Sequence, residues 1–296
     1  MSKILHNQKE TGKNIIGLPV DREFLFSDHK NIYKKGIEKR QTKLINQISF
    51  IKPFLKEDEK ILLVTTGCSP MSFLEQFLMG WIVFYIKRSL FVFTNRRIFH
   101  IPTKSNYTYR NSIANILYTD CQAIEIKGRS LVVKYKSGKT EKFYYIAGKE
   151  KNKTKSLLKT ISLEGAPSNS PGRMHLCPRC AEKLIADKYM CPSCRLEFKN
   201  RDEGKRISII YPGGGYFYTG HWWLGIGDAI AEIILIVLVI TALVEALQGS
   251  QDGFIPFVFL LILLVIEKLT SIYHSNHFIK EYIPTKNEIT PVIATQ

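Results

Sequence analysis

The sequence predicts a multidomain α+β membrane protein with a β-rich domain that ends in a helix, a small cysteine-rich module and a C-terminal transmembrane helical hairpin. Three observations predict this architecture. Short apolar runs separated by tight turns fill residues 60–146. Two Cys-x-x-Cys pairs follow within residues 177–194. Two long apolar runs lie nearer the C-terminus.

The charge of the chain is divided unevenly. Its 296 residues include 42 Lys plus Arg and 26 Asp plus Glu, a formal net charge of +16. Residues 207–296 contain three basic and seven acidic residues, a net charge of −4, which leaves +20 on residues 1–206. A basic body joined to an apolar segment argues against a simple soluble enzyme, and the composition excludes collagen-like and low-complexity classes.

Residues 1–56 are expected to form a mobile N-terminus followed by an amphipathic helix. Residues 1–27 are interpreted as mobile, and their polar start lacks the apolar segment of a cleavable signal peptide. Apolar positions then recur with helical spacing until Pro53 breaks the pattern. These positions are Ile37, Leu44, Ile45 and Ile48.

A β-rich domain is expected over residues 57–162. Six strands are predicted from short apolar runs bounded by turn residues. They are 61–66, 89–93, 97–101, 121–127, 130–136 and 140–146. Leu131, Val133 and Tyr135 alternate with polar positions, which is the pattern of a half-buried strand. Residues 149–162 are predicted to form the closing helix.

One apolar stretch of this domain, Phe73–Ile86, departs from the strand pattern. Its 14 residues include Glu75 and Gln76 and are too few to cross a hydrocarbon core of about 30 Å. We expect a helix that leads into a strand and touches the membrane. A membrane-spanning segment stays open as the alternative.

Three segments of the β-rich domain resemble the bacterial PH-like (PH/GRAM-type) fold. They are Leu90–Ile101 (LFVFTNRRIFHI), Ser112–Ile113 and Gly128–Lys139. The resemblance covers about residues 60–162 and implies strands followed by one C-terminal helix. It also implies binding of lipid or peptide, or a role as an interaction or assembly module.

Four basic residues beside the predicted strands are the candidate lipid contacts. They are Lys87, Arg88, Arg96 and Arg97. Each would contribute about 1 kcal/mol near an anionic membrane surface. At any single position, a solvated turn residue is the plainer interpretation. Together, the charge of +20 favours attraction to anionic phospholipid headgroups.

Residues 163–174 form a predicted linker to a module at 175–200 with two Cys-Pro-x-Cys pairs. The candidate metal ligands are Cys177, Cys180, Cys191 and Cys194. Four thiolates at this spacing can surround one ion at about 2.3 Å, and the pattern resembles the zinc ribbon. Four cysteine ligands leave no position for a catalytic water, so a structural zinc is expected, with iron as the alternative.

Other roles fit these cysteines less well. A thioredoxin-like site needs a single motif at the start of a helix, and disulfides are disfavoured in a reducing cytosol. His175, next to the first pair, is interpreted as a surface residue. Cys68 and Cys121 are isolated and are expected to be small buried apolar residues.

Two apolar runs predict the membrane hairpin. The first, 229–247, has 19 residues and nearly matches a hydrocarbon core of about 30 Å. The second, 254–273, includes Glu267 and Lys268 near its end. The six residues between the runs are turn residues without Lys or Arg. A buried helical pair in a soluble core is the alternative.

The positive-inside rule predicts the orientation of this hairpin. The basic body precedes the first run, and Lys280 and Lys286 follow the second. Both termini, including the tail at 276–296, are therefore expected in the cytoplasm. The protein is expected to be a multi-pass protein of the cell (inner) membrane.

The segment before the first run is rich in glycine and aromatic residues, which predicts a flexible segment at the membrane interface, preceded by a charged hinge at Lys199–Arg206. Its residues Pro212–Gly220 (PGGGYFYTG), Trp222–Trp223 and Gly225–Ile226 resemble the start of the TM2 family of two-helix membrane domains. The resemblance covers about residues 207–275. The loop QGSQDG departs from the Asp-Arg-Phe-like turn of some members, so their signalling and partners do not transfer.

No nucleophile elbow, HExxH motif, Walker loop or dinucleotide fingerprint occurs, so neither an enzyme nor a catalytic residue is predicted. We expect a non-enzymatic scaffold or adaptor whose PH-like and zinc-ribbon modules bind anionic lipid headgroups or a protein partner. Nucleic-acid binding is a disfavoured alternative, because residues 177–194 carry only +1. A small channel or transporter using Glu232 and Glu245 is another. The sequence leaves homo-oligomerisation open.

Overall fold

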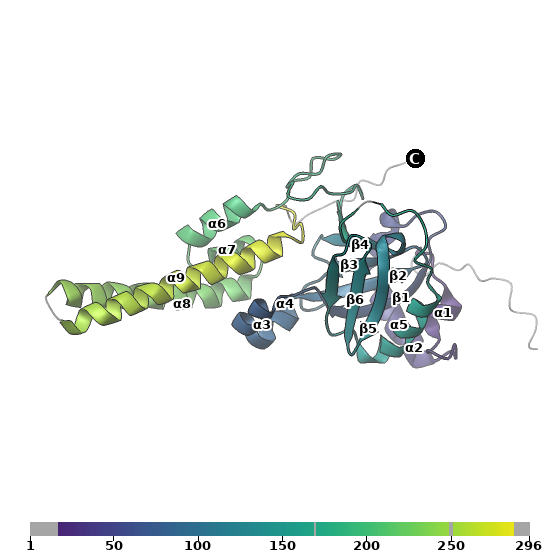
Figure 1. Ribbon diagram of the computed structural model, residues 1–296, viewed down its shortest axis with the longest axis horizontal. Coiled ribbons are helices and arrows are strands. Elements are labelled where there is room, and N and C mark those ends of the chain that lie inside the picture. The colour runs from purple at the N-terminus through teal and green to yellow at the C-terminus, as the bar shows by residue number, and fades with distance from the viewer. Residues whose placement is uncertain (1–16, 169, 249–250, 287–296) are drawn as a thin grey trace, which may run out of the picture. The chain divides into compact units, whose positions relative to one another are not determined.

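The computed structural model describes residues 17–168, 170–248 and 251–286. Within them the chain forms two compact units (Figure 1). The β unit comprises the residues up to Leu196, and the helical unit starts at Glu197. The predicted mixed α+β class is confirmed in a coarse form, as two antiparallel sheets and two apolar C-terminal helices.

In the described residues, eight strands form the two sheets of the β unit. The larger sheet has the order β1-β2-β3-β4-β8, and the smaller has the order β5-β6-β7. The strands are β1 (Ile61–Cys68), β2 (Arg88–Thr94), β3 (Arg97–Pro102), β4 (Ile113–Leu117), β5 (Cys121–Lys127), β6 (Ser130–Tyr135), β7 (Thr140–Phe143) and β8 (Met174–Leu176). The short 3-10 helix η3 (Tyr118–Asp120) joins the sheets, and helix α5 (Gly148–Thr160) follows β7.

The larger sheet is buried on both faces. Successive residues of a strand point to opposite faces, so Val92 lies in one apolar cluster while Phe91 and Phe93 lie in the other. The second cluster also contains apolar residues of β5–β7 and Leu157 of α5. Burial on both faces explains why β2 and β3 appear in the sequence as continuous apolar runs.

The segment before β1 covers the other face of the larger sheet. It contains α1 (Arg22–Phe26), α2 (Lys35–Asn46) and the 3-10 helix η1 (Ser49–Phe54). Their buried side chains include Leu25, Ile45, Ile48 and Ile51. The predicted mobility of residues 1–27 is therefore wrong for residues 17–27, since apolar burial fixes them, and residues 1–16 lie outside the described part.

Two polar side chains fasten this segment to the sheet and to α5. The amide of Gln41 donates to the carbonyl of Val64 at 2.9 Å and accepts from the N–H of Val64 at 3.1 Å. It thereby satisfies both backbone hydrogen-bonding groups of Val64 in the edge strand β1. Lys153 donates to the carbonyls of Phe24, Leu25 and Ser27 at the end of α1. Burial lowers the pKa of Lys153 to about 8.

The six predicted strands and the closing helix are confirmed, but β4 and β8 were not predicted. Strand β8 pairs with β4, with Ile113 opposite Leu176 and Asn115 opposite Met174. This pairing joins the cysteine-rich module to the larger sheet. A three-residue strand has too little pattern to predict, because its pairing depends on a partner about 60 residues earlier in the chain.

The connection between β1 and β2 contains three short helices: α3 (Phe73–Met79), η2 (Gly80–Ile82) and α4 (Val83–Ile86). The helical part of the predicted helix-then-strand segment is confirmed, but the strand begins only after it, at Arg88. We call residues Phe73–Ile86 the helical knob. Its contact with a membrane stays a prediction.

The helical unit contains α6 (Arg201–Ile210), α7 (Gly214–Tyr218), α8 (Trp222–Leu247) and α9 (Gln251–Ile279). Figure 1 shows α8 and α9 side by side as a hairpin. The helices Trp222–Leu247 and Gly253–Ile279 are long and apolar enough to cross a membrane. The predicted hinge at Lys199–Arg206 is instead largely helix α6, which begins after the N-cap Asn200.

The glycine-rich segment before α8 makes close backbone contacts. It is therefore packed against its neighbours, and the predicted flexible segment is corrected. A Cβ atom on Gly214 would lie 2.2 Å from the carbonyl oxygen of Ile207, and one on Gly213 would lie 2.1 Å from that of Gly225. Gly213 also has a φ of +66°, which favours glycine. The glycines therefore allow α6, α7 and α8 to pack closely.

Gly214→Ala is expected to destabilise the helical unit by about 1–3 kcal/mol, because backbone must move to admit the methyl group. Thermal unfolding of the full chain in lipid nanodiscs measures the effect. Gly227→Ala is the matched control, since Gly227 lies in α8 and a methyl group added there would meet no atom within 4 Å. Equal melting temperatures of both variants would contradict the close-packing role.

Candidate functional sites

The four predicted metal ligands converge in the structure. One ligand atom from each of the four cysteines lies within 4.8 Å of the others. The Sγ atoms of Cys177 and Cys194 are 3.5 Å apart, and those of Cys180 and Cys191 are 3.6 Å apart. Tetrahedral ligands at about 2.3 Å from a metal lie about 3.8 Å from one another, so this spacing fits one ion.

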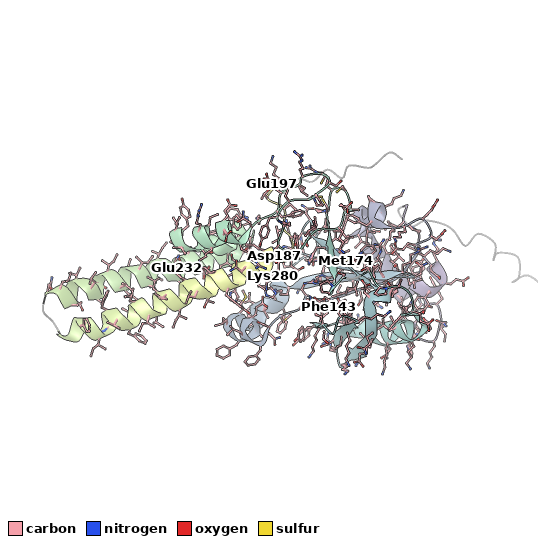
Figure 2. All side chains as sticks on the ribbon, turned by 45° about the horizontal axis from the view of Figure 1, so that its top comes forward. Phe143, Met174, Asp187, Glu197, Glu232 and Lys280 are labelled. Carbon is pink, nitrogen blue, oxygen red and sulfur yellow. The ribbon has the colours of Figure 1, made fainter. Side chains whose placement is uncertain are left out.

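Two similar knuckles hold the sulfur atoms. In the first, the N–H of Ala181 donates to the carbonyl of Cys177 at 2.9 Å, and in the second, Arg195 donates to Cys191 at 3.1 Å. Ala181 and Arg195 both have positive φ, which turns the chain back after the second cysteine of each pair. Asp187, labelled in Figure 2, lies on the loop between the knuckles.

The electrostatics of the cluster favour a bound cation. Burial raises the pKa of Cys177, although N–H groups of Cys180 and Arg179 bond its sulfur and oppose this shift. Four neighbouring thiolates repel one another, and a metal ion that supplies positive charge would favour their joint ionisation. The four-Cys group can bind a metal ion, and with every donor a protein sulfur it fits a structural role.

The two remaining cysteines are buried thiols in the β unit, as predicted. Burial raises the pKa of Cys68 to about 11 and that of Cys121 to about 12. Both are therefore protonated at neutral pH and poor nucleophiles. His175 is half-buried in β8, where it pairs with Ala114 of β4, so the predicted surface position is only partly correct.

Two of the four predicted lipid contacts are buried in ion pairs. Arg97 is 6% exposed and binds Glu59 through two nitrogen–oxygen contacts of 2.9 and 2.7 Å. Lys87 is 3% exposed, and its Nζ lies 2.8 Å from Oε1 of Glu75. In this structure, neither Arg97 nor Lys87 presents its charge to a headgroup, which corrects their predicted lipid-facing position.

The other two predicted contacts lie at opposite ends of β2. Arg96 is exposed in the turn between β2 and β3. Arg88 is half-buried at the start of β2, with its guanidinium 4.6 Å from the centre of the Tyr85 ring. The strand between them spans about 20 Å. The four predicted residues therefore do not form one site.

The helical knob buries a charged side chain and exposes apolar ones, which is the reverse of a surface helix on a soluble domain. Glu75 of α3 is fully buried, whereas Phe73 is 84% exposed and Phe77 is 75% exposed. Trp81 of η2 is 69% exposed. The other exposed apolar residues of the knob are Leu74, Leu78, Ile82 and Tyr85. A contiguous patch of this kind marks an interaction surface on a soluble domain.

A capping box, an ion pair and apolar contacts attach the helical knob to the rest of the β unit. Ser72 and Glu75 form a reciprocal capping box at the start of α3. Glu75 also makes the buried ion pair with Lys87, and Met71 and Val83 pack with Cys68. The exposed apolar side chains are thus presented by an ordered element.

Three basic side chains lie against aromatic rings at the edge of the knob. Besides Arg88, the guanidinium of Arg129 lies 5.7 Å from the Tyr145 ring centre, and Nζ of Lys142 lies 4.9 Å from that of Tyr144. The Tyr145 ring contacts Phe84 of α4, with centres 4.5 Å apart. Sequence reasoning missed Arg129 and Lys142, because their proximity to the knob depends on the fold.

The two carboxylates of the predicted transport path are not brought together. Glu232, labelled in Figure 2, is fully buried, and its Oε2 lies 2.5 Å from Nζ of Lys268. Glu245 is exposed near the other end of α8. Glu232 is instead close to Asp228 and Glu267.

No protein-family model and no curated protein sequence matches the chain. Among solved structures, it is similar to the hSac2 domain from human phosphoinositide phosphatase Sac2, with a TM-score of 0.24 and 18% identity. The match covers 39% of this chain and 75% of that chain. Similarity at this level supports neither a family nor an activity.

Proposed function

We propose that this chain is a non-enzymatic integral membrane protein whose β unit docks on the surface of an anionic bilayer through the helical knob. The observation that carries the proposal is the outward-facing apolar surface of the knob, with Phe73, Phe77 and Trp81 exposed. Aromatic side chains that project from the surface of a polar domain suit the interface between headgroups and acyl chains. Arg88, Arg129 and Lys142 beside them suit anionic headgroups.

The remaining parts of the proposal concern the anchor and the modules. We propose that α8 and α9 span the inner membrane as a TM2-like hairpin with both termini in the cytoplasm, which the two apolar helices support. We also propose a PH-like fold for residues 57–162, supported by two antiparallel sheets followed by α5. The four-Cys group is proposed to hold a structural zinc, and a protein partner is proposed for the adaptor role.

Trp81 provides a direct test of docking. In a Trp222→Phe, Trp223→Phe background, Trp81 is the sole tryptophan of the chain. With the full chain in nanodiscs that contain brominated anionic lipid, we expect Trp81 fluorescence to be strongly quenched, because bromine quenches tryptophan only at short range. Phe73→Glu with Phe77→Glu is expected to abolish the quenching, because moving two charged side chains into the apolar region of the bilayer has a high free-energy cost.

Two controls make this test specific. Ile185→Glu changes a residue that is 55% exposed in the cysteine-rich module, and it should leave the quenching unchanged. Arg129→Glu with Lys142→Glu should weaken docking on anionic lipid by at least about 2 kcal/mol, whereas Arg96→Glu should have little effect. Unquenched Trp81 in the parent protein would contradict the proposal and favour a protein partner for the knob.

A further inference from the structure

A short helical hairpin precedes α8. Gly214 of α7 lies against Ile207 of α6, where an added Cβ atom would collide with the carbonyl oxygen of Ile207. Tyr218, at the end of α7, donates its hydroxyl to Oε2 of Glu203, in the first turn of α6, at 2.8 Å. The two helices are therefore antiparallel, and the start of α6 lies beside the end of α7. The α6–α7 hairpin comprises residues 201–218, and its tip is the turn at 211–213.

The α6–α7 hairpin lies beside α9 (Figure 1). Near the start of α6, Gly204 packs on Ile279 at the end of α9, where an added Cβ atom would be 2.8 Å from Cδ1 of Ile279. Towards the end of α6, the carbonyl of Ser208 accepts a hydrogen bond from Nζ of Lys268, further towards the start of α9, at 2.9 Å. Helices α6 and α9 are therefore antiparallel. The tip of the hairpin points along α9 towards its N-terminal end.

The tip is level with the start of the apolar run of α8. A Cβ atom added to Gly213, in the tip, would be 3.1 Å from the Cβ atom of Ala229. Ala229 is the first residue of the apolar run 229–247, whose length nearly matches a hydrocarbon core of about 30 Å. If α8 spans a membrane, the tip therefore reaches the boundary between headgroups and acyl chains.

The exposed side chains of the hairpin change from charged to apolar towards the tip. At the tip and just before it, Ile209 is 54% exposed, Ile210 is 65% exposed and Tyr211 is 60% exposed. Residues 207–218 include no Asp, Glu, Lys or Arg. The exposed charged residues lie in the first two turns of α6 and are Asp202, Glu203, Lys205 and Arg206. This distribution suits an element with its base in water and its tip in lipid.

The backbone of the tip has partners that reduce the cost of leaving water. The N–H of Tyr211 donates to the carbonyl of Ile207 at 3.0 Å, and the N–H of Gly214 donates to the carbonyl of Tyr211 at 2.9 Å. Pro212 has no N–H, and Gly213 is buried against α8. Irregular backbone enters a membrane only where protein contacts satisfy or bury it, and the contacts of the tip are of this kind.

We propose that the α6–α7 hairpin is a re-entrant membrane segment. Its tip, with Ile209, Ile210 and Tyr211, enters the headgroup-proximal part of the acyl-chain region, and the chain returns to the side from which it came. Lipid is the partner because the tip packs beside Ala229, where α8 begins to expose apolar side chains such as Ile230, so acyl chains cover both surfaces. The inference rests on the proposed membrane span of α8 and α9 and adds another embedded element to it.

Ile210→Trp tests the depth of the tip. The chain has three tryptophans, so the substitutions Trp81→Phe, Trp222→Phe and Trp223→Phe remove them all, and Ile210→Trp then supplies the sole fluorescent reporter. The full chain is placed in zwitterionic nanodiscs whose lipids carry bromine either in the upper part of the acyl chain or at its end. We expect upper-chain bromine to remove most of the fluorescence and chain-end bromine to remove less, because bromine quenches tryptophan only at short range.

Three further substitutions in the same background complete the test. Asp202→Trp places the reporter at an exposed position of α6 about 12 Å nearer the base, where neither lipid should quench it. Leu238→Trp places it in the middle of the apolar run of α8, at a position that is 44% exposed, where chain-end bromine should quench it most. Ile209→Trp is a second reporter of the tip, used if thermal unfolding shows that Ile210→Trp disturbs the fold.

The outcomes separate this inference from the proposed function. Quenching of Leu238→Trp without quenching of either tip reporter would overturn the re-entrant hairpin, leave the spanning helices intact and assign the apolar tip to a protein partner. Equal quenching of Asp202→Trp and Ile210→Trp would also overturn it, because α6 would then lie flat on the bilayer. An unquenched Leu238→Trp would refute the span of α8 and the inference with it. Docking of the β unit is not involved, since Trp81 is replaced and the lipid is zwitterionic.

Discussion

Cys177→Ser is expected to release the bound metal and unfold the cysteine-rich module of the full chain. A structural four-Cys site typically binds zinc with about 10–16 kcal/mol, and this free energy stabilises the fold. The module has few buried apolar side chains of its own, such as Leu184 and Leu196. Elemental analysis should show a fall from about one metal ion per chain to none, and it also identifies zinc or iron.

Hydrogen exchange shows how far the unfolding extends. Strand β8 connects directly to Cys177 and pairs with the edge of β4. We therefore expect faster exchange at Met174–Leu176, with little change in β1 and β2. Cys121→Ala is the control, because it removes a buried thiol outside the cluster and should retain the metal. A Cys177→Ser protein that keeps its metal and exchanges hydrogen at Met174–Leu176 as slowly as the wild type would refute the structural role of the four-Cys site.

Arg97→Ala is expected to destabilise the β unit by about 3–5 kcal/mol, because it leaves Glu59 buried without its partner. The lost guanidinium binds both carboxylate oxygens of Glu59 and donates to the carbonyl of Phe54 at 2.8 Å. Arg96→Ala is the matched control, since this neighbouring arginine is exposed and should change stability by less than about 0.5 kcal/mol. Thermal unfolding of the two variants measures the difference.

The same ion pair predicts a dependence of stability on pH. Burial opposes ionisation of Glu59, but hydrogen bonds from Arg97, Lys56 and Thr94 outweigh it and lower its pKa. A lowered pKa contributes stability above the pKa of the unfolded chain, near 4.3, that is lost as pH falls through the folded value. The difference between wild type and Arg97→Ala should therefore shrink below about pH 4. A constant difference would contradict ionisation of Glu59.

Local spacing was sufficient to predict the four-Cys cluster. Each Cys-Pro-x-Cys pair forms its knuckle within five residues, as the bonds from Ala181 and Arg195 show. The alternation of β6 and the apolar lengths of α8 and α9 are likewise properties of short stretches of chain. Signals of this kind depend on neighbouring residues, so they can be interpreted without knowledge of the fold.

Pairing across the chain could not be predicted in this way. Arg96 and Arg97 are adjacent and chemically identical, yet only Arg97 meets Glu59, which is 38 residues away. Lys87 and Arg88 are also adjacent, but only Lys87 is buried, in an ion pair with Glu75. The reversed polarity of the knob follows from this ion pair, which draws the charged side of α3 inward and leaves its apolar side exposed.

The four-Cys group, most of the strands and the two apolar helices could be predicted from the spacing of nearby residues. Which charges are buried and which carboxylates converge depends instead on contacts between distant parts of the chain. Glu232 and Lys268 are 36 residues apart and meet because α8 and α9 pack as a hairpin. The free energy of a buried charge depends on its partner, and that partner is chosen by the fold.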